Sequence, residues 1–359
     1  MTAMQTMPFE MELTGSNGTR QAVCCRERLR VIPQRRTVFA GSWQGRPVIV
    51  KRFEDCFSGY RCGREKRGLE RLLARGLATP KVLLSGKDAG GHHVLVIETI
   101  ENAADVLTAI QSLSFENAVR DLLLAVFRYV ADMHRAGVVQ KDFHLGNFLI
   151  AGSTVYAIDP ACMRFRHAPI APEPSYRQLA VLLATLPRPF LAAWDVAFVQ
   201  LYCTLRGLTY SPDVMERIRC LAERRRAKRL PHALKKTLRN SKHFFVLQTP
   251  GCRGVFCREA FDSDTARRFM EQIELHGEAS IEKDYEIIRY EPGNRLQAFV
   301  WRMVQSPARR DWLNAWRLLY GGGTGPRPAA FIEKGNFAFL NKAWYIAGGI
   351  PSNIAAPLK

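Results

Sequence analysis

The chain changes character near Asn102, and this change limits the folds it can adopt. Before that point, five short runs rich in β-branched and aromatic residues predict strands: RLRVI, TVFAGSW, RPVIVKRF, KVLLSG and HHVLVIETI. An amphipathic segment, residues 64–77, predicts one helix between the third and fourth strands. After Asn102 the apolar spacing becomes helical, starting with a long helix over residues 118–137. The pattern predicts an α+β fold in which a small antiparallel β lobe precedes a helical lobe.

The same patterns divide the chain into four segments. Residues 1–27 carry no periodic pattern, and we expect an irregular lead-in there. Residues 28–101 correspond to the β lobe, residues 102–240 to the helical lobe with a basic tail, and residues 241–359 to a further β/α unit. A length of 359 residues is sufficient for more than one hydrophobic core.

The last segment repeats the order of the first lobe. GNRLQAFVWR has the spacing of QGRPVIVKR, RDWLNAWRLLYGGGTGP that of REKRGLERLLARGLATP, and KAWYIAGGI that of HHVLVIETI. In this alignment the position of Lys51 falls on Trp301, and that of Glu98 on Gly348. We expect a degenerate second copy of the β lobe; the alternative is a chance similarity between helix and strand patterns.

The excess of basic residues indicates an anionic partner. The chain has 52 Lys and Arg against 33 Asp and Glu, a formal charge of +19. Nucleic acid, anionic lipid headgroups and phosphorylated substrates all fit this balance. No basic motif interleaved with aromatic residues is visible, so we expect no nucleic-acid partner. Basic residues are densest in segment 216–242, where seven could face a membrane: Arg224, Arg225, Arg226, Lys228, Arg229, Lys235 and Lys236.

The cysteines and the N-terminal residues favour a cytoplasmic protein. The nine cysteines form no CxxC pair and no zinc-like spacing, so we expect reduced thiols. The N-terminus, MTAMQTMPFEMELTG, lacks the long apolar stretch of a signal peptide. No apolar run reaches the roughly 18 to 20 residues that span a bilayer.

The segment QKDFHLGNFLI places polar residues between two apolar runs. Phosphoryl transfer needs a carboxylate near the attacking hydroxyl, oxygen ligands for magnesium and positive charge on the phosphates. Asp142 and Asn147 lie five residues apart on a loop after a helix, and Asp159 ends the strand VYAID. Upstream, Lys51 ends the apolar run PVIVK, and Glu65 in the next helix could pair with it. Each residue alone also fits a polar turn or a helix end, but the set in this order favours a phosphoryl-transfer site.

These motifs resemble the protein-kinase-like superfamily and, within it, the bacterial lipopolysaccharide kinase family, which phosphorylates Kdo or heptose of the inner core. VIVKRF resembles the strand-three Lys segment, and the Glu65 helix with GLATP resembles helix C. VIETI is similar to the hinge, MHRAGVVQKDFHLGNFLI to the catalytic loop, and VYAIDPACMRF to the metal-binding segment. The resemblance covers about residues 28–200. It implies a bilobal protein-kinase-like fold, with residues 241–359 as a degenerate second N-lobe-like unit.

The resemblance also implies ATP and Mg²⁺ as cofactors, and it assigns roles to eight residues. Asp142 would be the base that orients the sugar hydroxyl, and Glu65 would anchor Lys51 on the α- and β-phosphates. His144 would touch the γ-phosphate or make a structural hydrogen bond, and main-chain groups at the hinge would meet adenine. The full set is catalytic Asp142 and His144, metal-binding Asn147 and Asp159, and cofactor-binding Lys51, Glu65, Glu98 and Ile100.

Three positions depart from the family pattern. Gln140 replaces a usual His, FAGSWQG lacks a full G-x-G-x-x-G phosphate loop, and Pro160 follows the metal-binding Asp in place of Gly. Gln140 and the incomplete phosphate loop, together with the truncated second lobe, support an alternative reading as a pseudokinase-like binding or regulatory module. Pro160 instead resembles the lipopolysaccharide kinases more than the protein kinases.

Charge and segment length bear on the acceptor. A basic chain suits an anionic glycolipid or phosphosugar better than the polycations that aminoglycoside kinases bind. The segment IAPEPSYRQL follows Asp159 closely and leaves little room for a peptide platform. We therefore expect a kinase of an inner-core sugar, peripheral to the inner membrane through segment 216–242. Another small-molecule or protein acceptor is the alternative, and the oligomeric state is left open.

Overall fold

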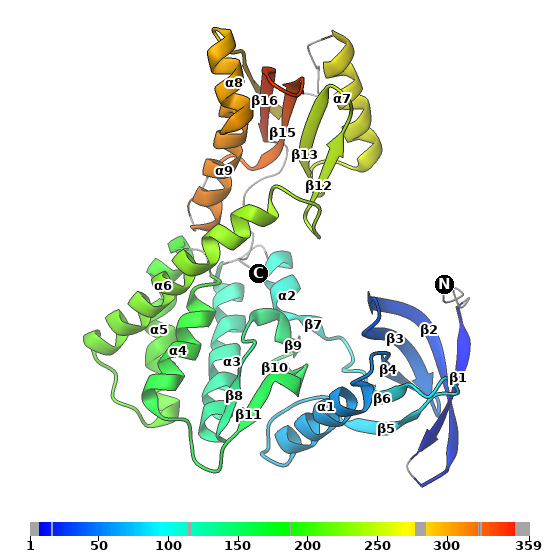
Figure 1. The fold of residues 1–359 in the computed structure, drawn as a ribbon. Coiled ribbons are helices and arrows are strands. Elements are labelled where there is room, and N and C mark those ends of the chain that lie inside the picture. Colours follow the sequence, from blue (N-terminus) through cyan, green and yellow to red (C-terminus); the bar gives the residue numbers. More distant parts are fainter. Residues whose placement is uncertain are drawn as a thin grey trace. The chain divides into compact units, whose positions relative to one another are not determined.

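The structure, a computed structural model, describes residues 7–15, 17–113, 116–186, 188–276, 285–321, 323 and 325–348. The chain forms two compact units (Figure 1). Met1–Leu179 and Val196–Met215 make the first unit, and Ala180–Asp195 and Glu216–Lys359 make the second. The expected boundary after residue 240 therefore lies inside the second unit.

The first unit begins with a closed antiparallel barrel, whose strand order is β1-β2-β3-β4-β6-β5. It closes where Thr14 and Gly15 of the first strand pair with the fifth. Alternate side chains fill the barrel, as the two-residue period of a strand requires. The strands are β1 (Phe9–Gly15), β2 (Arg20–Ile32), β3 (Arg36–Trp43), β4 (Arg46–Phe53), β5 (Val82–Lys87) and β6 (His93–Glu98).

The N-terminal segment corrects the expectation of an irregular lead-in over residues 1–27. From Phe9 onward it forms β1 and the first part of β2, so the barrel has six strands instead of five. Met11 and Leu13 point into the barrel core, while Glu10 and Glu12 are exposed. This alternation in FEMELT is itself a strand pattern, which the charged residues obscure.

Helix α1 (Ser58–Leu73) connects β4 to β5 and covers one side of the barrel. Its buried stripe contains Cys62, Glu65, Leu69 and Leu72, at the three- and four-residue spacing of one helix face. Three of these residues are apolar, and the fourth is a carboxylate that the fold must pair.

The rest of the first unit is mainly helical. Two small sheets, β10-β9-β7 and β11-β8, lie among its helices. The elements along the chain are β7 (Ala104–Asp105), α2 (Val106–Ser112), α3 (Glu116–Arg135), β8 (Val138–Gln140), η1 (Leu145–Asn147), β9 (Phe148–Ala151), β10 (Thr154–Ala157), η2 (Pro160–Cys162), β11 (Met163–Phe165), α4 (Pro172–Leu183) and α5 (Arg188–Arg206). Helices α4 and α5 contribute residues to both units.

A five-stranded antiparallel sheet, in the order β12-β13-β15-β16-β14, forms the centre of the second unit. Neighbouring side chains on one strand enter different cores: Phe331 packs with Trp312 and Trp316, whereas Ile332 packs with the opposite helix. The elements are α6 (Pro212–Lys236), β12 (Phe244–Gln248), β13 (Cys252–Cys257), α7 (Ser263–His276), β14 (Tyr285–Tyr290), α8 (Arg295–Met303), α9 (Pro307–Tyr320), β15 (Pro328–Gly335) and β16 (Leu340–Gly348).

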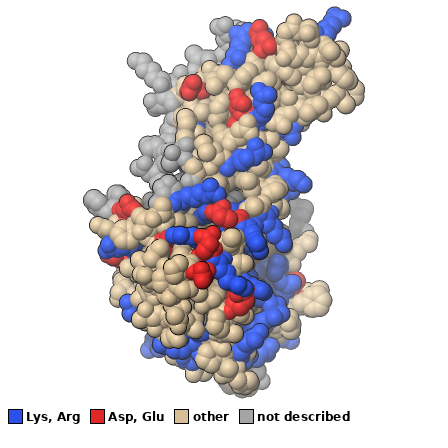
Figure 2. Space-filling model, turned by 90° about the vertical axis from the view of Figure 1, so that its left-hand side faces the viewer, with Lys and Arg blue, Asp and Glu red and all other residues tan. Residues whose placement is uncertain are grey.

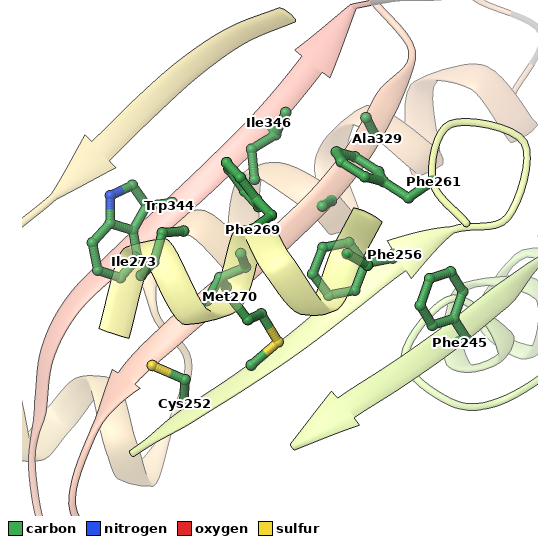
Figure 3. Close-up of a cluster of buried hydrophobic side chains, with 13 residues drawn as sticks. Phe245, Cys252, Phe256, Phe261, Phe269, Met270, Ile273, Ala329, Trp344 and Ile346 are labelled. Atoms are coloured by element: carbon green, nitrogen blue, oxygen red, sulfur yellow. The ribbon is translucent and has the colours of Figure 1, made fainter. Parts of the chain in front are cut away.

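Helices cover both faces of this sheet. On one face, Phe269, Met270 and Ile273 of α7 lie over Phe256 and Trp344 (Figure 3). On the other face, α9 packs its tryptophans against the strands. Strands buried on both faces read as continuous apolar runs, which explains the sequence of β15 and β16.

The alignment of this unit with the first lobe is wrong at the first of its three matched segments. GNRLQAFVWR, matched to strand β4, contains helix α8, so Trp301 is a helical residue and not a counterpart of Lys51 on a strand. Asn294 caps this helix by accepting a hydrogen bond from the amide of Gln297. The sheet is also open and covered on both faces, whereas the first lobe is a closed barrel.

Most of the basic segment, up to Lys236, lies in helix α6, and not all of that part is exposed. Lys and Arg side chains spread over much of the face in Figure 2, with Asp and Glu among them. Arg226, expected to face a membrane, is buried: its guanidinium donates to the carbonyls of Leu183, Ala184 and Leu186 and pairs with Glu223. Arg226 thus supplies donors to carbonyl groups at and just after the end of α4, where the helix provides too few amide donors. No helix in the described ranges is long and apolar enough to cross a membrane.

Candidate active site

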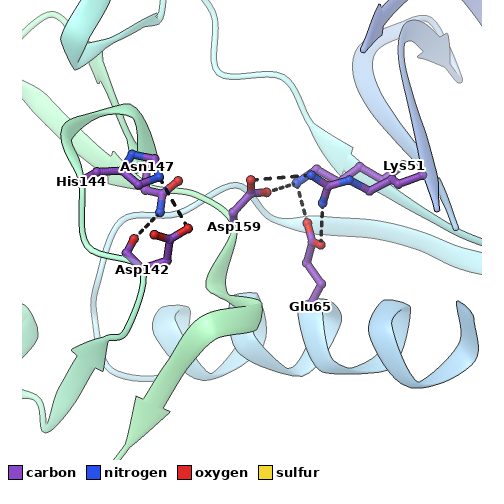
Figure 4. A network of polar contacts seen from close by, with 7 residues as sticks. Lys51, Glu65, Asp142, His144, Asn147 and Asp159 are labelled. Carbon is purple, nitrogen blue, oxygen red and sulfur yellow. Dashed lines mark hydrogen bonds and ion pairs between the residues drawn. The ribbon is translucent and has the colours of Figure 1, made fainter. Parts of the chain in front are cut away.

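Lys51 of β4 lies between two carboxylates that are distant in sequence (Figure 4). Its Nζ donates to Oε1 of Glu65 on α1 and, over 2.8 Å, to Oδ1 of Asp159. Arg36, at the start of β3, reaches the same two groups: Nη1 is 3.3 Å from Oε2 of Glu65, and Nη2 is 3.8 Å from Oδ2 of Asp159. Two cations therefore hold two carboxylates in one network.

Charge pairing outweighs burial in this network. Burial acts to lower the pKa of Lys51, but the carboxylates of Glu65 and Asp159 raise it above its usual value. Burial acts to raise the pKa of Asp159, but Lys51 and then Arg36 hold it below its usual range. At neutral pH Lys51 is protonated and Asp159 is ionised, the states that phosphate and metal binding require.

A close approach between α1 and the turn after Asp159 places Glu65 in the network. At Gly68, one helical turn beyond Glu65, an added Cβ would lie 2.8 Å from the ring of Pro160. Any larger residue would push α1 away from this turn. Asp159 itself has φ 53° and ψ 54°, a left-handed conformation that Asp tolerates better than most residues.

A polar turn holds Asp142 and Asn147 together. Nδ2 of Asn147 donates to the carbonyl of Asp142 over 2.7 Å, which leaves the amide oxygen of Asn147 as its possible metal ligand. The Asp142 side chain is 68% exposed, and its Oδ2 lies 3.7 Å from Nε2 of His144. A carboxylate so open to solvent can meet an incoming hydroxyl.

The β9–β10 hairpin brings this turn beside Asp159. Its strands pair Phe148 with Ala157, and the amide of Ile158 donates to the carbonyl of Asn147 over 2.9 Å. Asn147 and Asp159 therefore lie at the same end of the hairpin. Their oxygen atoms are ligands of the kind that Mg²⁺ accepts.

The hinge residues have structural contacts of their own. The amide of Glu98 donates to the carbonyl of Lys81, and Oε1 of Glu98 accepts from the amide of Lys81 over 2.8 Å. Both groups therefore tie β6 to the start of β5. Ile100 lies two residues further on, in the irregular segment after β6. If adenine binds at Glu98, it would contact main-chain atoms other than the Glu98 amide, which is already bonded to Lys81.

Residues 47–159 match the lipopolysaccharide kinase (Kdo/WaaP) family. The match covers just under a third of the chain. All eight predicted site residues lie inside it, and Asp159 is its last residue. A comparison with curated proteins gives no match. The match to the lipopolysaccharide kinase family supports a phosphotransferase.

Arg36 lies outside the stretch that matches the lipopolysaccharide kinase family, and the sequence analysis missed it. Its strand register explains its position: Lys51 pairs with Val38, near the β2–β3 turn. FAGSWQG, expected as the phosphate loop, forms the end of β3 and the turn into β4, where Trp43 pairs with Arg46 at the opposite end of the same strands. The hairpin nearest the site is therefore the one that carries Arg36.

Thr79 and Tyr129 were also missed, and both support the strand that leads to Asp159. Thr79 Oγ1 donates to the carbonyl of Ala157 over 2.7 Å. The hydroxyl of Tyr129 donates to the carbonyl of Ala78 and accepts from the amide of Ala157. Thr79 belongs to the GLATP motif, which could have marked it as a candidate residue. Only the fold shows that it contacts Ala157.

A chain of buried hydrogen bonds supports the strand that leads into the Asp142 turn. Gln178 Nε2 donates to the carbonyl of Gln140, so its Oε1 must accept from Nε2 of His134. Nδ1 of His134 then accepts from the hydroxyl of Tyr202 over 2.7 Å. The side-chain amide of Gln140 is buried and makes no hydrogen bond within the described structure. Gln140 thus braces the loop through its main chain.

We expect His134 to make the stability of the first unit depend on pH. Burial lowers the pKa of His134 to about 4, against roughly 6.5 in an unfolded chain. Its contribution is therefore present above pH 6.5 and falls by about 3 kcal/mol as pH drops towards 4, because only the unfolded chain takes up the proton. Chemical unfolding followed by circular dichroism at a series of pH values would measure this slope.

The matched variants are His134→Gln and, at an exposed histidine, His167→Gln. The first should lose most of the slope between pH 6.5 and 4, and the second should keep it. Equal slopes in both variants would show that His134 is not the titrating group.

Proposed function

We propose that the first unit is an ATP- and magnesium-dependent kinase that phosphorylates a sugar, heptose or Kdo, of the lipopolysaccharide inner core at the cytoplasmic membrane face. One observation carries this proposal: Lys51, Glu65 and Asp159 meet in one ion-pair network, beside the turn that holds Asp142 and Asn147. The family match independently covers all five residues.

The residues present fit the cofactors. Asn147 and Asp159 offer an amide oxygen and a carboxylate at one hairpin end, and Lys51 and Arg36 offer positive charge beside them. When bound, ATP and Mg²⁺ supply the phosphoryl group and neutralise its developing charge. Lys51 would bind the α- and β-phosphates, with Glu65 fixing its ammonium group in place.

Asp142 would act on the acceptor. Its exposed carboxylate would accept a hydrogen bond from the sugar hydroxyl, orient it and take its proton during transfer. The contact between Asn147 and the main chain of Asp142 would hold the base and a metal ligand at a fixed separation. His144, within 3.7 Å of Asp142, would be close enough to contact the transferred group.

Two features favour an anionic sugar acceptor over a peptide. The chain carries a formal charge of +19, which suits the phosphates and carboxylates of an inner-core glycolipid. The segment between Asp159 and α4 is short and holds only η2 and β11 as regular elements, so it offers a peptide little surface. Exposed basic residues of segment 216–242 would add attraction to the anionic membrane.

Mass spectrometry of the lipopolysaccharide core from cells with and without the gene tests the proposal. We expect loss of one phosphate from the core when the gene is deleted, and its return when the gene is restored. An unchanged phosphate count would reject the proposed acceptor. Calorimetry of ATP binding with and without Mg²⁺ separates the alternatives: binding without transfer to any core sugar would favour a binding module.

A further inference from the structure

Helix α8 of the second unit is apolar on two opposite faces. Ala298 and Trp301 form the buried face, and α8 packs against β16. On the opposite side, Leu296, Phe299 and Met303 are exposed to solvent. A surface helix normally has a polar outer face, so an apolar outer face indicates a binding partner.

The exposed residues form one continuous surface with a neighbouring loop. At 3.6 residues per turn, Leu296, Phe299, Val300 and Met303 fall within an arc of about 100°. The β15–β16 loop adds Phe337, which is 94% exposed. We call the α8 apolar patch the following residues: Leu296, Phe299, Val300, Met303, Val304 and Phe337.

Two contacts hold the loop against the helix. Arg302 Nε donates to the carbonyl of Phe337 over 3.2 Å. The ring of Phe299 meets that of Phe339 in an edge-to-face arrangement, with centroids 6.3 Å apart. The main chain of Phe337 is therefore fixed against α8 by a hydrogen bond, while its side chain is exposed to solvent.

Positive charge borders the patch. Arg295 and Arg302 lie on the same edge of α8, next to Phe299, by helical spacing. Residues 285–348 contain nine Lys and Arg against four Asp and Glu. Apolar side chains beside arginines suit the region where lipid headgroups meet acyl chains.

We propose that the α8 apolar patch docks the protein on an anionic lipid bilayer, with its apolar side chains inserted between the headgroups and Arg295 contacting lipid phosphates. A second copy of the chain fits less well, because joining two such surfaces would bring like charges together. The patch is also small, whereas stable interfaces usually bury more than about 1,000 Å². This inference goes beyond the proposed function and does not depend on phosphoryl transfer.

Sedimentation of the full-length protein with vesicles tests the docking surface. The vesicles contain phosphatidylcholine alone or phosphatidylcholine with phosphatidylglycerol. We expect binding to the anionic vesicles, weakened on the order of tenfold or more in a Phe337→Ser/Met303→Ser double variant, because two apolar side chains no longer insert. Arg295→Glu should weaken binding to anionic vesicles and reduce its dependence on salt.

The control is Leu275→Ser on α7, at a leucine that is 77% exposed but outside the patch, and it should bind as the wild type does. Asp142→Asn should also bind normally, so failure of the kinase proposal would not disturb this result. Equal binding by the double variant and the wild type would overturn the inference and assign docking to other basic residues. Absence of vesicle binding, or a dimer that the double variant dissociates, would overturn it as well.

Discussion

Asp142→Asn should reduce phosphoryl transfer to the acceptor by roughly 10²- to 10⁴-fold, the usual contribution of a general base. The amide keeps the shape of the side chain but cannot take the proton of the attacking hydroxyl. The loop should survive, because Asn147 binds the main-chain carbonyl of Asp142 and not its carboxylate. The KM for ATP should change little, because the positive charges that would bind the phosphates belong to Lys51 and Arg36. Steady-state transfer from labelled ATP to purified core oligosaccharide measures both constants.

Asp121→Asn is the matched control for this change. Its side chain is 62% exposed, close to the 68% of Asp142, and it lies on α3 of the same unit. It should leave the transfer rate unaltered. A rate for Asp142→Asn within tenfold of the wild type would remove Asp142 from the role of base and would favour a site that orients the acceptor by other groups.

Most residues of the candidate site could be predicted from local sequence motifs. Lys51 follows an apolar strand, Glu65 falls on the buried stripe of a helix, and the Asp142 turn follows another helix. Each residue can be assigned to its strand, helix or turn from the few residues around it in the sequence. The ion pairs that join them span up to 108 residues, so only the order of the motifs could suggest that they meet.

Arg36 shows why part of the site could not be predicted. No motif marks it, and its place depends on which end of the β2–β3 hairpin lies beside Lys51. Which end lies beside Lys51 is set by the strand register, and the sequence does not show that register. The prediction also lacked strand β1, which precedes the first predicted strand. FAGSWQG has the glycines expected of a phosphate loop, but register puts its turn at the far end of the same strands.

At helix α8 a strand was expected where the structure has a helix, because the amino-acid composition was given more weight than the spacing of the buried residues. Its phenylalanine, valine and tryptophan favour a strand, and its exposed apolar face removes the alternation of polar and apolar residues that marks a surface helix. The signals that favour a helix are the capping Asn294 and the three-residue spacing of Ala298 and Trp301. The unusual surface misled the prediction and is also the feature that suggests a partner.

Lys51→Met should impair both activity and stability. Without the ammonium group, bound phosphates lose a preorganised charge, and we expect transfer to fall by about 10²- to 10³-fold. Glu65 is only 1% exposed, and removing one partner of a buried ion pair typically costs about 3–5 kcal/mol. Arg36 still reaches Glu65 and Asp159, so the loss should lie at or below the lower end of this range. Transfer assays and denaturant unfolding at pH 7 measure the two effects.

The pH dependence separates this ion pair from a general packing defect. Because Lys51 helps to hold the pKa of Asp159 below its usual range, the stability from Asp159 is present above the unfolded value near 4 and is lost as pH falls through the folded value. The stability difference between wild type and Lys51→Met should therefore shrink at acid pH. Lys66→Met, at a half-exposed lysine 3.9 Å from Glu70, should change stability by less than about 1 kcal/mol. If the difference for Lys51→Met stays constant over the acid range in which the wild type loses stability, the cause is lost packing, because a protonated Asp159 no longer needs the cation.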